Sequence, residues 1–175
     1  GNGNPVVLIH GFPMHAKVWD PVVAELKKSV TVITLDLPGF GTSPLPDTPF
    51  SIDDIAALVS NALREQITGK MVVVGHSLGG YIALALADAH ADIFKGMVLL
   101  HSTAQADSEE KKSSRTKVVE FIRDNGVEAF TSNFIQPLFA DKGHPAIPKV
   151  RKINMESSEA AVVNYTLAMR NRPDR

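Results

Sequence analysis

The chain has 175 residues, of which 44% are hydrophobic and 21% are charged, a balance typical of one globular domain that excludes disordered and fibrous classes. Its 18 basic and 19 acidic residues give a formal net charge of -1. Because this lacks the basic excess that drives binding to phosphate backbones, we expect no nucleic-acid partner. The absence of cysteine excludes disulfides, thiolate metal sites and cysteine nucleophiles.

No segment of the sequence predicts a membrane span. The longest strongly apolar stretch, residues 78–87, contains two glycines and is well short of the ~20 residues that a membrane helix needs. Residues 1–5 lack the basic start of a targeting peptide. We therefore expect a soluble, cytoplasmic protein with no membrane partner.

Four short apolar runs rich in branched residues predict the strands of a sheet. They lack the apolar and polar alternation of a strand with one wet face, so we expect buried parallel strands. Helical stretches separate them, and one opens with Ser51 and Asp54 at capping-box spacing. This alternation predicts an α/β fold, a parallel sheet flanked by helices on both faces. The predicted strands are 6–9, 31–35, 71–74 and 97–100, and the predicted helices are 18–28, 51–66 and 78–90.

The character of the chain changes after residue 101. Charged residues dominate 107–124 but leave an apolar stripe, which predicts a solvated amphipathic helix. Further helices are predicted over 127–139 and 149–169, and no further strand is evident. We therefore divide the chain into an α/β core, residues 1–102, and a helical region, residues 103–175.

The strongest chemical signal is Gly75-His76-Ser77-Leu78-Gly79. This pentapeptide follows a predicted buried strand and opens an apolar helix, the setting in which a sharp turn exposes a nucleophilic serine. Gly75 and Gly79 fit the steric demand of such a turn. The alternative is a plain glycine-rich turn with a helix-capping serine.

A second signal, His10-Gly11-Phe12, also lies at the carboxyl end of a predicted strand. Acyl transfer needs two hydrogen-bond donors aimed at the developing oxyanion. The backbone N–H groups of Phe12 and Leu78 are the candidates. His10 is expected to fix the loop by hydrogen bonds and not to act as general base. The six histidines show no metal-ligand spacing, and the loop at Gly39-Phe40-Gly41 lacks the third glycine of a dinucleotide fingerprint, so we expect no metal and no cofactor.

In three motifs the chain resembles the α/β-hydrolase fold family, and small carboxylesterases, enol-lactonases, carbon-carbon bond hydrolases and cofactor-free haloperoxidases in particular. The resemblance implies a serine hydrolase in which Ser77 attacks an ester, lactone or similar small carbonyl substrate, with the helical region as a cap or lid. The motifs are His10-Gly11-Phe12-Pro13, Asp36-Leu37-Pro38-Gly39-Phe40-Gly41-Thr42-Ser43 and Gly75-His76-Ser77-Leu78-Gly79-Gly80.

The chain departs from this family in its triad. The family order places an Asp or Glu and then the His after Ser77. His90 falls at the far end of a helix, His101 is expected to be a pocket-lining or core histidine, and His144 lies among helices. Asp107-Ser108-Glu109-Glu110 is expected to form a helix start, with its acidic residues at the positive end of the helix dipole. The triad Asp and His are therefore predicted to lie outside this chain, in a further C-terminal segment or a second chain that completes the sheet.

Two consequences follow from this departure. The strand 97–100 would present an exposed edge without a further strand, and the 175 residues alone are predicted to be inactive. Two alternatives to a serine hydrolase remain open. One is a non-catalytic binding module built on the same fold, and the other is a cofactor-free perhydrolase or haloperoxidase that uses the same triad.

Overall fold

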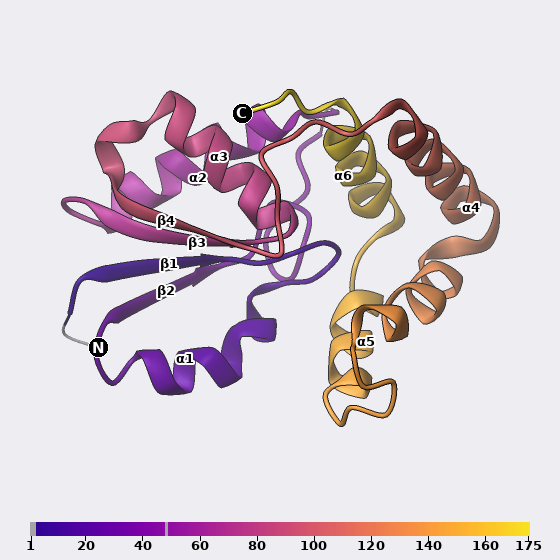
Figure 1. Cartoon of the computed structure of the whole chain (residues 1–175), viewed down its shortest axis with the longest axis horizontal. Coiled ribbons are helices and arrows are strands. Elements are labelled where there is room, and N and C mark those ends of the chain that lie inside the picture. The colour runs from indigo at the N-terminus through magenta and orange to yellow at the C-terminus, as the bar shows by residue number, and fades with distance from the viewer. Residues whose placement is uncertain (1–2, 48) are drawn as a thin grey trace.

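The computed structural model describes residues 3–47 and 49–175. Residues 1 and 2, at the start of the predicted core, lie outside the described residues. Figure 1 shows a twisted sheet with helices above and below it, and a group of further helices beyond one end of the strands. The predicted α/β class is confirmed by this arrangement.

The sheet is parallel and has the strand order β2-β1-β3-β4. All four predicted strands are confirmed, and three begin earlier or end later than expected. Central β1 carries Val7, Leu8 and Ile9, which are fully buried, as expected of a strand covered on both faces. The strands are β1 (Pro5–Ile9), β2 (Thr31–Leu35), β3 (Met71–His76) and β4 (Phe94–Leu100).

Three α-helices cover the two faces of the sheet. Figure 1 shows α1 (Asp20–Leu26) on one face and α2 (Ile52–Gln66) with α3 (Leu78–Ala89) on the other. A 3-10 turn (Ala16–Trp19) precedes α1, so the helix predicted over 18–28 is shorter than expected, and a second 3-10 turn (Ala91–Ile93) follows α3. The predicted capping box is confirmed, because Ser51 and Asp54 bond to each other's backbone N–H.

The helices after residue 101 agree in part with the predicted pieces. The segment labelled α4 (Glu109–Phe134) consists of two helices that meet at a kink at Gly126, whose φ is +81°, as the separate helices predicted over 107–124 and 127–139 required. A 3-10 turn (Gln136–Leu138) follows it. The single helix predicted over 149–169 is wrong, because α5 (Ile147–Met155) and α6 (Glu159–Asn171) are separate helices. Ser158 begins the second, since its side chain accepts a hydrogen bond from the Ala161 N–H.

Both edges of the sheet lack a neighbouring strand among the described residues. On β4, residues Met97 to Leu100 are 36–47% exposed although all four are apolar. An apolar, unpaired edge strand is a template for pairing with another chain. The exposed edge predicted for strand 97–100 is thus present. Within the described part of the chain, no helix is long and apolar enough to cross a membrane.

Candidate functional site

A single residue, Ser77, separates the end of β3 from the start of α3. Its backbone has φ +51° and ψ -111°, a conformation that costs a residue with a side chain about 1–3 kcal/mol. Two neighbours hold it there. The Ser77 N–H donates to the Leu100 carbonyl at 2.9 Å, and the Ser77 carbonyl accepts from the Ser102 hydroxyl at 2.8 Å. Strain of this kind is found at turns that aim a side chain.

The glycines on either side of Ser77 are required by close backbone packing. A methyl group on Gly75 would overlap the carbonyl of Gly79, and one on Gly79 would overlap the carbonyl of Ile9 in β1. Strand β3 and helix α3 therefore approach each other, and β1, more closely than any side chain permits. The Gly-x-Ser-x-Gly spacing is a packing requirement of this turn.

The loop after β1 runs beside this turn and carries Phe12. Among the described residues, no hydrogen bond from the backbone N–H of Phe12 or of Leu78 is found. Leu78 is the first residue of α3, where the backbone N–H groups have no partner inside the helix and carry its positive dipole end. The loop after β1 and the helix start thus each contribute a free donor.

His10 ties the loop after β1 to the loop after β2. Its Nε2 accepts from the Leu37 N–H at 2.9 Å, so Nδ1 is the donor to the Gly11 carbonyl, also at 2.9 Å. Burial lowers the pKa of His10 to about 4. Both nitrogens of the neutral ring are therefore occupied, which leaves neither of them to accept a proton from Ser77.

Asp36, for which the sequence indicated no separate role, organises the same region. Its carboxylate accepts from the backbone N–H groups of Ala16 at 2.8 Å and Thr42 at 2.9 Å. Partial burial would raise the pKa of Asp36, but these hydrogen bonds outweigh it and lower the pKa. The place of Asp36 directly after a predicted strand is the sequence signal that could have identified it.

Two cavities meet at Ser77. One has a volume of about 430 Å³ and the other about 450 Å³. Helix α4 and the turn after it form much of their outer walls, so the helical region covers the carboxyl ends of the strands, as Figure 1 also shows. The residues common to both cavities are Phe12, Ser77, His101, Phe134 and Leu138.

His101 is the downstream histidine that borders both cavities, as the sequence predicted for a pocket-lining residue. Its φ is +48°, so the residue after β4 is strained like Ser77. The rings of His76 and His101 lie 6.3 Å apart. Burial, and secondarily the neighbouring His101, lower the pKa of His76. No hydrogen bond from Ser77 Oγ to a histidine is found among the described residues.

The other candidates for a base and an acid lie away from Ser77. His90 follows the last residue of α3, and His144 lies in the exposed turn before α5, where its Nδ1 accepts from the Ala146 N–H. Among the described residues, the histidine that contacts a carboxylate is His15, 3.0 Å from Glu156, and it borders neither cavity. No group of three His, Asp or Glu residues in the described chain could hold a metal ion.

Asp107 is the centre of a buried ion-pair cluster. Its side chain is 0% exposed and pairs with Arg115, with Arg172 at 2.8 Å and with Lys111 at 3.5 Å. Burial would raise the pKa of Asp107, but hydrogen bonds from the two arginines lower it. The helix start expected at Asp107-Ser108-Glu109-Glu110 is confirmed, because Ser108 is the N-cap of α4, its hydroxyl accepts from the Lys111 N–H, and Glu109 and Glu110 lie in the first turn.

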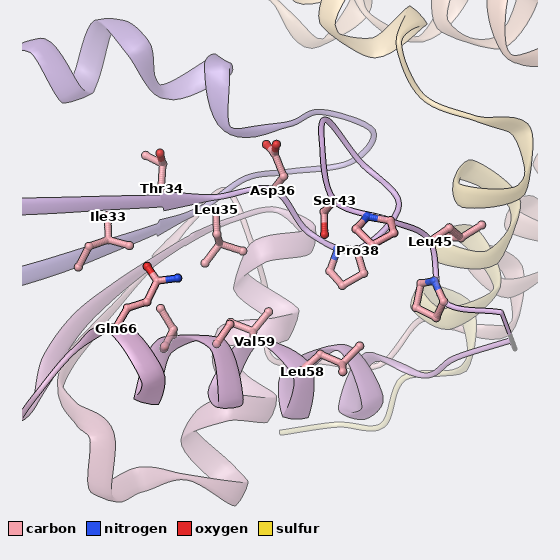
Figure 2. Close-up of a pocket in the computed structure, with 14 residues that line it drawn as sticks. Ile33, Thr34, Leu35, Asp36, Pro38, Ser43, Leu45, Leu58, Val59 and Gln66 are labelled. Atoms are coloured by element: carbon pink, nitrogen blue, oxygen red, sulfur yellow. The ribbon is translucent and has the colours of Figure 1, made fainter.

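A third and larger cavity, of about 600 Å³, lies along the unpaired edge of β2. Figure 2 shows Leu35 pointing from β2 toward Val59 of α2, and Ile33 lying next to Gln66. This groove is mainly apolar, and Ser77 does not border it. This larger cavity is therefore separate from the two cavities at Ser77.

Comparison with known proteins gives consistent matches. A family model described as alpha/beta hydrolase fold matches residues 4–144. A pimeloyl-[acyl-carrier protein] methyl ester esterase of Nitrosomonas europaea is 34% identical over 103 residues, which is 59% of this chain and 39% of the relative. An (E)-2-((N-methylformamido)methylene)succinate hydrolase of Acinetobacter baylyi is 32% identical over 101 residues, 58% of this chain and 38% of the relative.

Among solved structures, a thermophilic esterase of Thermogutta terrifontis is similar over nearly the whole chain. The TM-score is 0.89 at 32% identity, and the match covers 99% of this chain and 66% of that esterase. A bromoperoxidase of Bacillus anthracis has the same fold, with a TM-score of 0.83 at 22% identity. The chain thus matches less than two fifths of the length of these curated relatives and about two thirds of these solved structures.

Proposed function

Because the chain belongs to the α/β-hydrolase fold family, we propose that it is the nucleophile-bearing part of a serine hydrolase that cleaves esters, lactones or similar small carbonyl compounds. The observation that carries this proposal is the strained Ser77, held between β3 and α3 at the junction of two cavities. The esterases and hydrolases among the similar proteins support the same reaction class.

In the proposed reaction, Ser77 Oγ attacks the substrate carbonyl carbon and loses its proton to a general base. The carbonyl oxygen becomes an oxyanion, which accepts hydrogen bonds from the backbone N–H groups of Phe12 and Leu78. Collapse of this intermediate breaks the bond to the leaving group, which takes the proton, and leaves an acyl-enzyme that water hydrolyses. The free N–H of each donor residue supports this assignment.

The base and the acid that orients it lie outside the described residues in this proposal. No described histidine is hydrogen-bonded to Ser77, and Asp107 is fully engaged with cations. Further strands, from the same polypeptide or a second one, pair with the apolar edge of β4 and bring the Asp and His to the cavities. The exposure of residues Met97 to Leu100 supports this pairing.

Labelling with a fluorophosphonate tests the proposal, because this reagent reacts only with an activated serine. We expect stoichiometric labelling of Ser77 in the intact natural protein and none in Ser77→Ala. Ser114→Ala, which changes an exposed serine of α4, is the matched control and should label normally. A folded protein that binds small carbonyl compounds but does not label would instead be a binding module.

The same proposal predicts that residues 1–175 alone do not turn over ester substrates. The purified 175-residue chain should hydrolyse p-nitrophenyl acetate no faster than its Ser77→Ala variant, because it lacks the base. Turnover that requires Ser77 in this chain would show that one of its own histidines, with His101 as the first candidate, serves as the base.

A further inference from the structure

The two cavities that meet at Ser77 differ in charge. The first is completed by apolar side chains, among them Met14, Val18 and Val150. The second is bordered by two cations, Lys111 and Arg115, which lie one turn apart on α4. No Asp or Glu borders either cavity among the described residues. The surroundings of Ser77 are therefore apolar on one side and basic on the other.

The positive charge of the second cavity is not cancelled by the protein. Asp107 is the carboxylate that both cations contact, and its buried side chain also pairs with Arg172. Arg172 itself is 3% exposed, donates to the Met169 and Gln105 carbonyls and stacks on the Tyr81 ring. Three cations thus share one buried carboxylate, and positive charge remains on the side that faces the cavity.

The two cations differ in how firmly they are held. Arg115 is 17% exposed, and Asp107 fixes its guanidinium through Nε, with Nη1 near the Met169 sulfur. Lys111 is 54% exposed and only 3.5 Å from Asp107, so its ammonium retains donors for another partner. A fixed guanidinium beside an adjustable ammonium suits a carboxylate, which can accept hydrogen bonds from both.

From this arrangement we infer that Lys111 and Arg115 bind a carboxylate of the substrate. The proposed hydrolase then acts on carbonyl compounds that carry a free carboxylate on one side of the scissile bond and an apolar group on the other. The inference rests on the proposed function for the reaction itself. It adds the substrate class and two residues that determine specificity.

A half-ester and its neutral diester provide the test. In the intact natural protein, we expect monomethyl glutarate to be hydrolysed with a higher kcat/KM than dimethyl glutarate. Lys111→Gln should reduce this preference about tenfold, as expected for a charged hydrogen bond. The matched control is Lys112→Gln, since Lys112 pairs with Glu109 and borders neither cavity, and it should keep the preference. Raising the salt concentration should weaken the preference as well.

Binding measurements separate failure of this inference from failure of the proposed function. Calorimetric titration of the Ser77→Ala variant with monomethyl glutarate needs no catalysis. Tighter binding of the half-ester than of the diester, lost with Lys111→Gln, supports the carboxylate site even if no hydrolysis is found. Equal binding of the two compounds, or the same loss in Lys112→Gln, overturns the inference even if Ser77 proves to be the nucleophile.

Discussion

Removal of the buried carboxylate of Asp107 should destabilise the protein strongly. The side chains of Asp107 and Arg172 are 0% and 3% exposed, and their oxygen and nitrogen lie 2.8 Å apart. In Asp107→Ala the guanidinium of Arg172 stays buried without its counter-charge, since its bonds to the Met169 and Gln105 carbonyls do not neutralise it. Breaking one partner of such a pair costs about 3–5 kcal/mol of unfolding free energy.

Urea unfolding of the intact natural protein, with linear extrapolation, measures this loss. Asp92→Ala is the matched control, because Asp92 also pairs with an arginine, Arg64, but is 66% exposed, and exposed pairs contribute little. A loss in Asp107→Ala no larger than in Asp92→Ala would refute the reasoning. It would mean that water reaches Arg172 or that the C-terminal segment moves to expose it.

The pH dependence of the unfolding free energy provides a second test of the ion pairs around Asp107. The pKa of Asp107 in the folded protein is lowered from the ordinary value of 3.8. A lowered folded pKa means that the stabilisation is fully present above pH 3.8 and is lost as the pH falls through the folded pKa. Asp107→Asn should therefore be less stable than the natural protein at neutral pH, and the difference should shrink as the solution is acidified below pH 3.8.

Two further predictions concern the packing around the site. Gly75→Ala should abolish soluble folded protein, because the added methyl group overlaps the Gly79 carbonyl. Gly96→Ala, which has open space around the added methyl group, is the control and should fold. Circular dichroism of both variants measures the difference. Ser51→Ala should lower the unfolding free energy by about 1 kcal/mol, because the Asp54 N–H loses its acceptor. Ser114→Ala serves as its control in the same urea experiment.

The α/β core could be predicted from the sequence because its signals are local. The branched apolar run at 31–35 coincides with β2, and the capping box at Ser51 places the start of α2. The break between α5 and α6 also had a local signal, Ser158 followed by Glu159, which the prediction of one helix over 149–169 did not take into account. Local sequence rules thus predicted a helix or strand correctly wherever two signals did not indicate different structures.

The charge distribution of the site could not be predicted in this way. Asp107 meets Arg172 across 65 residues of sequence, and no local pattern indicates which of the 18 basic residues faces a cavity. Lys111 and Lys112 are neighbours in a charged helix, yet Lys111 borders the cavity with Ser77 and Lys112 pairs with Glu109. That difference depends on how α4 packs on α6, which follows from the whole fold.

The geometry of Ser77 depends on the edge strand of the sheet. Its N–H bonds to the carbonyl of Leu100, the last residue of β4, and its carbonyl accepts from Ser102 just beyond. A strained residue keeps its conformation only when its surroundings hold it, and here half of that support comes from a strand with one free edge. Pairing of a further strand with β4 would therefore fix the proposed nucleophile as well as bury the edge. In the proposed hydrolase, completion of the sheet would thus also hold Ser77 in its strained conformation.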